Sequence, residues 1–281
     1  MSDSIEMRDP AHEETIVRLR HPGRWIATAV VLLIVAAALY SVATNPAFQW
    51  GVVARYMLDP QILIGLTRTL ELTVLAMVIG LVLGTVLALL RLSDNKLLST
   101  ISWIYIWFFR SVPTLVQLIF WYNFGALYSS ITLKIPFGPT LFSENTNTLI
   151  TPMFAALAGL GLSQSAYTAE VIRAGIASVP AGQARAAIAL GMSRMMTFRR
   201  IILPQAMKVV IPPVGNEVIS MVKNTSLVSV IAMADLLYTV QLIYSRTYET
   251  IPLLIVASLW YLIIVSILSL VQHRLERRFQ H

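Results

Sequence analysis

Residues 184–204 read ARAAIALGMSRMMTFRRIILP and place four arginines in the middle of an otherwise apolar chain. This stretch is too long for a simple connection between membrane helices, and its Ala, Leu and Arg content favours helix over an extended linker. Pro180 suits the start of a helix that runs to Leu190, and Gly191 suits its end. We predict a second helical run over residues 193–203 that ends before Pro204.

Two short helices held outside the apolar spans have two interpretations. They can present an apolar face to a groove on a cytosolic partner. Alternatively, an amphipathic helix can lie on the membrane surface. We favour docking to a partner.

The composition indicates a membrane protein. Hydrophobic residues make up 57% of the 281 residues and charged residues 12%, and the mean hydropathy is +0.72. A helix needs about 20 apolar residues to cross the hydrocarbon core. We predict an all-α polytopic protein with six spans: four uncharged runs over residues 25–54, 72–90, 145–169 and 250–272, and two less uniform ones over residues 104–128 and 211–234.

The Lys and Arg residues predict the orientation, because cytoplasmic loops are enriched in them. They concentrate in four segments, which contain residues 8–24, 91–96, 173–208 and 274–278. Only Arg55, Arg68, Lys134 and Arg246 fall on the other side. Both termini and the arginine-rich loop are therefore predicted to be cytoplasmic. The net charge of +7 follows from this topology and does not indicate nucleic-acid binding.

Polar residues in the fifth predicted span form an arc on one face of a helix. Asn216, Ser220 and Lys223 recur at i, i+4 and i+7, and Glu217 and Asn224 widen the arc. A lysine in the middle of a span costs at least about 3 kcal/mol to insert, so it should face a partner or a wet cavity. The arc is either one wall of a substrate path or a polar contact that locks subunits together.

Arg110 and Pro113 form a second polar group. Proline bends a helix and frees a carbonyl, which Arg110 could bind. Alternatively, Arg110 reaches the cytoplasmic headgroups, which we consider the simpler interpretation. Gln117 lies seven residues after Arg110 and could extend a polar stripe.

Other features have structural interpretations. Glu170 with Arg173, and Arg68 with Glu71, have the spacing of ion pairs on a helix surface. Gly80, Gly84 and Ala88 form a stripe of small residues, which predicts close helix packing.

The sequence lacks the residues that several classes of enzymatic activity require. No Gly-Lys pair occurs, so a phosphate-binding Walker loop is absent, and there is no cysteine. The four histidines lie in the terminal segments, and no metal-ligand spacing is present. We predict that the chain is not an enzyme and holds no metal or cofactor.

The spacing around the loop resembles a known motif. Arg185-Ala186-Ala187, Gly191 and Ile201-x-Leu203-Pro204 match the EAA motif of permease subunits in bacterial ATP-binding-cassette importers. Five further segments resemble the permeases for polar amino acids within that family: residues 69–73, 109–117, 166–173, 182–183 and 223–229.

This resemblance implies a domain organisation. A permease core spans residues 65–275 and contains a cytoplasmic coupling loop over residues 173–208. An extra transmembrane helix over residues 23–45 precedes the core. The tails over residues 1–22 and 276–281 are expected in the cytoplasm, the first of them poorly ordered.

The resemblance also implies a function and partners. The chain is expected to be the permease of an importer in the bacterial inner membrane, where it moves polar amino acids by alternating access. Two copies of an ATPase would bind ATP and Mg, a second permease would pair with this one, and a periplasmic protein would deliver the amino acid. The residues that couple the permease to the ATPase would be Gly182, Arg185, Ala186, Ala187, Gly191, Ile201, Leu203 and Pro204. The substrate path would include Glu170, Asn216, Glu217, Ser220, Lys223 and Asn224, together with Arg110 and Gln117.

The chain departs from the family pattern at two positions. The first position of the motif is usually glutamate and is Arg185 here, which reverses the charge presented to the ATPase. Asn224 stands where aspartate is usual. The alternative function is a self-sufficient secondary transporter or channel, and transport that persists without an ATPase would favour it.

Overall fold

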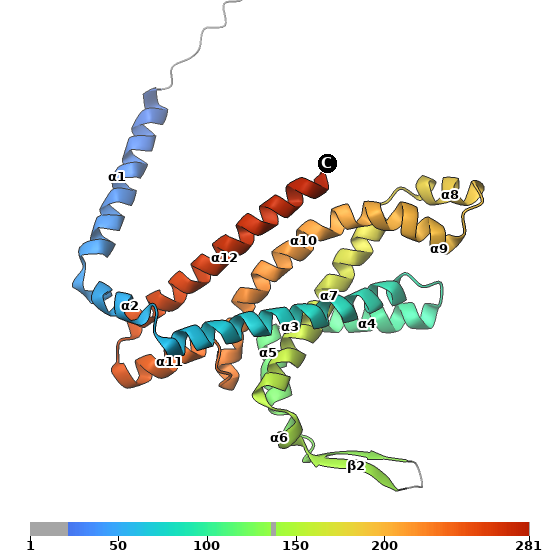
Figure 1. The fold of residues 1–281 in the computed structure, drawn as a ribbon, viewed down its shortest axis with the longest axis horizontal. Coiled ribbons are helices and arrows are strands. Elements are labelled where there is room, and N and C mark those ends of the chain that lie inside the picture. Colours follow the sequence, from blue (N-terminus) through green and yellow to red (C-terminus); the bar gives the residue numbers. More distant parts are fainter. Residues whose placement is uncertain (1–21, 136–138, 281) are drawn as a thin grey trace, which may run out of the picture. The chain divides into compact units, whose positions relative to one another are not determined.

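The computed structural model describes residues 22–135 and 139–280 (Figure 1). The chain divides into two units, Met1–Phe48 and Gln49–His281. The first unit contains the helix α1 (Pro22–Thr44) and the short turn η1 (Pro46–Phe48). The predicted disordered tail lies outside the described residues, except for Pro22, which begins α1. The range of α1 agrees with the predicted helix over residues 23–45.

The second unit is mostly helical. In chain order its elements are α2 (Trp50–Tyr56), α3 (Pro60–Arg91), α4 (Lys96–Ser111), α5 (Thr114–Tyr122), η2 (Phe124–Ala126), β1 (Ser130–Lys134), β2 (Thr140–Asn145), α6 (Thr146–Leu149), α7 (Pro152–Ala177), α8 (Ala181–Ala189), α9 (Arg194–Thr197), η3 (Phe198–Ile202), α10 (Leu203–Asn224), η4 (Thr225–Ile231), α11 (Leu236–Thr247) and α12 (Thr250–Gln280). α12 runs through the predicted C-terminal tail as far as Gln280.

Within the described residues, fewer helices suit a membrane than the six predicted. Gly23–Thr44, Pro60–Arg91 and Thr250–Arg277 are each long and apolar enough to cross it. Two bent pairs of helices raise the number to five if each pair forms one span. The predicted span over residues 145–169 is instead divided, because α7 begins only at Pro152, where Thr151 caps it by accepting a hydrogen bond from the Phe154 amide (3.2 Å).

Close packing of α3 against α7 forms the centre of the second unit. A Cβ added at Gly84 would lie 2.8 Å from the Ser165 carbonyl oxygen, and one at Gly80 would lie 2.5 Å from Cγ of Gln164. Ala88 is fully buried on the same stripe. The predicted role of these small residues in helix packing is confirmed.

Two apolar cores flank this seam. One gathers buried side chains from α3, α5, α7, α10 and η4, including Leu72, Leu118 and Leu160. The other joins α2, α3, α11 and α12. The first core packs α7 and α10 together with α3.

The predicted span over residues 104–128 is not one straight helix. α4 and α5 meet at a bend of 98°, with Pro113 at the break. Gln117, which is buried, donates hydrogen bonds from Nε2 to the carbonyl oxygens of Phe109 (3.1 Å) and Val112 (2.8 Å). The freed end of α4 is therefore held by Gln117, and Arg110 does not take the role that we considered for it.

The predicted helix end before Pro204 is wrong. The chain continues without interruption from α9 through η3, a π-helical turn, into α10. Pro204 lies in the first turn of α10, directly after the π-helical turn. Proline is tolerated in the first turn of a helix, so the chain passes Pro204 without a break. α10 ends at Asn224 and η4 continues the helical segment to Ile231, so this segment covers most of the predicted span over residues 211–234. α11 follows after a 46° bend.

A β-hairpin was not predicted. β1 and β2 pair antiparallel, with Ile131 opposite Glu144 and Leu133 opposite Phe142. All the residues of both strands are exposed. Figure 1 shows the hairpin at one end of α7 and α8 at the other.

Candidate functional site

A polar cavity of about 190 Å³ lies between α5, α7 and α10. We call it the polar cavity. Its lining consists of Thr114, Leu160, Ser163, Gln164, Tyr167, Glu217, Met221 and Asn224. It is the place where two predicted path residues from α10 meet polar residues of α7.

Hydrogen bonds order the walls of the polar cavity. Gln164 Nε2 donates to Glu217 Oε2 and to Thr168 Oγ1, both at 3.2 Å. The hydroxyl groups of Thr114 and Ser163 lie 3.2 Å apart. The Glu217 carboxylate keeps further acceptor capacity, since a carboxylate can accept about four hydrogen bonds.

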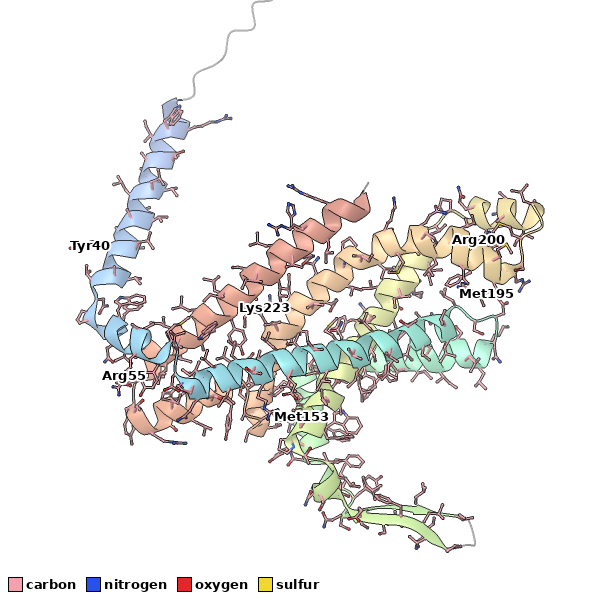
Figure 2. All side chains as sticks on the ribbon, viewed as in Figure 1. Tyr40, Arg55, Met153, Met195, Arg200 and Lys223 are labelled. Atoms are coloured by element: carbon pink, nitrogen blue, oxygen red, sulfur yellow. The ribbon has the colours of Figure 1, made fainter. Side chains whose placement is uncertain are left out.

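The predicted arc on α10 is split between two faces. Glu217, Met221 and Asn224 recur at i, i+4 and i+7 and line the cavity. Asn216 and Lys223 are exposed on the neighbouring face (Figure 2 labels Lys223), and Ser220 is half-buried outside the cavity lining. Adjacent helix positions differ by about 100°, so a shift of one position separates these two faces.

A second cavity, of about 560 Å³, borders the first. We call it the arginine cavity. Its polar lining includes Arg91, Arg110, Glu170, Arg173 and Ser111, and its aromatic lining includes Trp103, Trp107 and Tyr167. Tyr167 lines both cavities and therefore forms part of the boundary between them.

The charged groups of the arginine cavity are partly neutralised. Arg173 donates from Nε to Glu170 Oε1 (3.1 Å) and from Nη2 to Glu170 Oε2 (2.8 Å), which confirms the predicted ion pair. The Arg110 guanidinium carbon lies 5.4 Å from the centre of the Tyr167 ring, a cation–π geometry. Arg91 donates to the Ser99 hydroxyl at 2.8 Å. The two cavities thus differ in sign: one has a single carboxylate, and the other has three arginines with one carboxylate.

Gln117 is not part of either cavity. It lies in the α4–α5 elbow and contributes to an apolar pocket with Phe108, Phe109 and Val116. Its predicted place in a substrate path is therefore not supported by its position.

Several residues of the two cavities were not predicted as site residues, namely Thr114, Ser163, Gln164, Tyr167, Arg91 and the two tryptophans. The polar run Ser163-Gln164-Ser165 inside an apolar span was the available signal for α7. No comparable signal places Arg91 beside Glu170, because that proximity depends on how α3 and α4 pack against α7.

The arginine-rich loop forms a compact helical unit. α8 ends in a Schellman motif, in which the Gly191 amide donates to the Ile188 carbonyl (2.9 Å) and the Met192 amide to the Ala187 carbonyl (3.1 Å). Gly191 has φ +81°, so the predicted helix stop at this glycine is confirmed. Of the predicted coupling residues, Gly182, Arg185 and Ala186 are exposed on α8, whereas Ala187 is buried. Ile201, Leu203 and Pro204 lie on η3 and α10.

These features define a multi-pass membrane protein with a polar cavity among its helices and a projecting helical loop. A family model described as "Binding-protein-dependent transport system inner membrane component" matches residues 80–281. The chain belongs to this family.

The chain is also similar to individual permease proteins and to a solved transporter structure. The chain is 45% identical over 266 residues to the arginine transport system permease protein ArgU of Corynebacterium glutamicum, an alignment that covers 93% of this chain and 82% of ArgU. It is 37% identical over 210 residues to the nopaline transport system permease protein NocM of Agrobacterium fabrum, covering 75% of this chain and 84% of NocM. A crystal structure of an amino acid ABC transporter with histidines matches with a TM-score of 0.66 and 37% identity, covering 78% of this chain and 94% of that one.

Proposed function

We propose that this chain is the permease subunit of an ATP-driven importer that moves polar amino acids across the bacterial inner membrane by alternating access. The observation that carries the proposal is the polar cavity on α7 and α10, because α10 also continues without interruption into the arginine-rich loop. One helix, α10, therefore joins the polar cavity to the loop that would receive the movement of an ATPase. The 45% identical arginine permease and the 37% identical amino acid transporter structure support this assignment.

The proposed membrane arrangement has six spans with both termini in the cytoplasm. The extra helix over residues 23–45 precedes a core over residues 65–275, and the loop over residues 173–208 couples the core to the ATPase. The distribution of Lys and Arg supports this orientation.

The proposed substrate path centres on Glu217 and Asn224 in the polar cavity. Glu217 has free acceptor capacity for the ammonium group that every amino acid carries. We propose that Arg110, which lies beside Tyr167 in the arginine cavity, binds the carboxylate of the amino acid. Asn216, Ser220 and Lys223 are proposed to face the second permease, where their polar groups would be removed from lipid.

The proposed complex contains this chain, a second permease, two ATPase subunits and a periplasmic amino-acid-binding protein. ATP and Mg would be used by the ATPase alone. This chain would supply the path and the coupling loop, and it would catalyse no reaction itself.

Reconstitution tests the proposal directly. The tagged chain is purified from its native membrane with the proteins that accompany it, which are identified by mass spectrometry, and the complex is placed in proteoliposomes. Uptake of radiolabelled amino acids is expected only when ATP is present on the loop side and the binding protein on the hairpin side. Uptake by the chain alone, without ATP, would instead establish a self-sufficient transporter.

A further inference from the structure

Among the described residues, Tyr167 is the one that lines both the polar cavity and the arginine cavity. Ser163, Tyr167 and Glu170 recur at i, i+4 and i+7, so they follow one another along the same face of α7. Ser163 lines the polar cavity, and Glu170 lines the arginine cavity. The Tyr167 side chain therefore lies between the two cavities on this face of the helix.

The arginine cavity lies on the side of Tyr167 that leads to the arginine-rich loop. α7 ends at Ala177, shortly before α8, and Glu170 and Arg173 are near that end. Arg91, which also lines the arginine cavity, is the last residue of α3. In the proposed topology these helix ends face the cytoplasm. An amino acid that leaves the polar cavity along α7 would therefore pass Tyr167 before it reaches the arginine cavity.

The backbone that carries Tyr167 is tightly packed. Ala166, Thr168 and Ala169 are each no more than 1% exposed. A Cβ added at Gly84 of α3 would lie 2.7 Å from Thr168 Cβ, so no space separates the two helices at this level. Packing of this density leaves α7 little room to shift. The part of Tyr167 that is free to move is its side chain.

One contact holds the Tyr167 ring. The side chain is 39% exposed, and no hydrogen bond of its hydroxyl is present among the described residues. The Arg110 guanidinium carbon lies 5.4 Å from the ring centre. Tyr105 differs, because its hydroxyl lies 2.8 Å from Ser165 Oγ and donates to the Leu162 carbonyl oxygen at 3.2 Å. Exposed side chains change rotamer rapidly, so the cation–π contact with Arg110 is what biases the position of the Tyr167 ring.

We propose that the Tyr167 ring is a gate between the polar cavity and the arginine cavity, and that Arg110 holds the ring in its closed position. The inference rests on the proposed function, because it takes the two cavities as consecutive parts of one substrate path. The ring supplies both the barrier and the π face that Arg110 contacts, so the hydroxyl should not matter. Arg110 can hold the ring and still bind a carboxylate, because a guanidinium stacks through its face and donates in its plane.

The accessibility of a cysteine measures this gate without relying on transport. The chain has no cysteine, so Ser163→Cys places a single thiol in the polar cavity, behind Tyr167 as seen from the loop. The whole complex is kept in inside-out membrane vesicles, which expose the loop side, and the rate of reaction with a membrane-impermeant methanethiosulfonate is measured. We expect Tyr167→Ala to raise this rate by about tenfold or more and Arg110→Gln to raise it by about two- to fivefold. Tyr167→Phe should leave the rate unchanged.

Two matched controls separate a gate from a general loosening of the protein. Tyr122→Ala removes a tyrosine of α5 that is 40% exposed and lines neither cavity, so it should leave the Ser163→Cys rate unchanged. Ser111→Cys places the thiol in the arginine cavity, on the loop side of the ring. Its rate should be the same whether position 167 holds the native tyrosine or carries Tyr167→Ala.

An equal Ser163→Cys rate with and without Tyr167→Ala would overturn the inference, since the ring would then not limit passage. A rise of the same size with Tyr122→Ala, or at Ser111→Cys, would also overturn it, because the effect would not be specific to passage between the cavities. A rate that Arg110→Gln does not change would refute the part that concerns Arg110. In each case the proposed function stands if uptake by the unaltered complex depends on ATP, whereas uptake that needs no ATP contradicts the proposed function itself.

Discussion

The Gln117 side chain performs a task at the α4–α5 break that backbone groups cannot perform. Pro113 has no backbone N–H to donate to the Phe109 carbonyl oxygen near the end of α4. Gln117 Nε2 donates to this oxygen and to the carbonyl oxygen of Val112, which follows α4. If the Gln117 side chain were removed, these buried carbonyl oxygens would lack a hydrogen-bond donor, and the protein would be destabilised by the free energy that is needed to keep them away from water. Gln117 is therefore a residue that stabilises the bend.

We predict that Gln117→Leu lowers the free energy of unfolding by about 1–3 kcal/mol. The measurement is thermal unfolding of the purified complex in detergent. Gln61→Leu, at an exposed glutamine in the first turn of α3, is the control and should have an unchanged melting temperature. An equal melting temperature for Gln117→Leu would show that other groups satisfy these carbonyls.

Glu217 is the only carboxylate that lines the polar cavity among the described residues. We predict that Glu217→Gln raises the KM for amino-acid uptake by about tenfold or more, because a charge-assisted contact to the substrate ammonium becomes a neutral one. ATP hydrolysis in the absence of substrate should be unchanged, and uptake kinetics in proteoliposomes provide the measurement.

The control for this variant is Glu144→Gln, which removes a carboxylate from the exposed β-hairpin. The isosteric amide at position 217 can still accept a hydrogen bond from Gln164, so the cavity wall should keep its shape. An unchanged KM would mean that the substrate path does not use Glu217.

At the scale of elements, the contact between α3 and α7 depends on the small size of the side chains that face it. A Cβ at Gly84 would lie 2.7 Å from Cβ of Thr168 and 2.8 Å from the Ser165 carbonyl oxygen. Both distances are shorter than a van der Waals contact, so the neighbouring atoms would have to move. The two helices would have to separate, and α7 carries half of the polar cavity.

We predict that Gly84→Ala destabilises the protein by about 1–3 kcal/mol, the usual cost of overpacking. Gly51→Ala is the matched control, because a Cβ at Gly51 meets nothing within 4 Å. The melting temperatures of the two variants are compared, and a stability of Gly84→Ala equal to that of Gly51→Ala would mean that the seam can open without cost.

At the scale of the whole molecule, α7 links two surfaces that are proposed to lie on opposite sides of the membrane. The hairpin precedes α7 and the arginine-rich loop follows it (Figure 1). The sequence contains no cysteine, so single cysteines can report on each side without background.

We predict that Ser130→Cys, on the hairpin, reacts with a membrane-impermeant maleimide in spheroplasts. Ala189→Cys, on α8, should react only after the membrane is permeabilised. Both residues are exposed, so a difference in labelling reports the side of the membrane and not burial. Labelling of both cysteines in unpermeabilised spheroplasts would contradict the proposed topology.

The composition, the apolar runs and the arginine-rich loop are local properties, so the chain alone was enough to predict a helical membrane protein, the stop at Gly191 and the family that the resemblance named. Helix periodicity also showed that Asn216, Ser220 and Lys223 share one face. It could not show that the cavity lies on the next face, with Glu217 and Asn224, because that choice depends on where α7 packs. The 98° bend at Pro113 depends likewise on a side chain, Gln117, which donates to carbonyl oxygens on the other side of the bend. The hairpin had a local signal in the alternation of Ser130-Ile131-Thr132-Leu133, and the polar run Ser163-Gln164-Ser165 was a local signal for one wall of the polar cavity. The cavities themselves depend on tertiary structure: small residues of α3 let α7 approach, and that approach sets which polar groups meet.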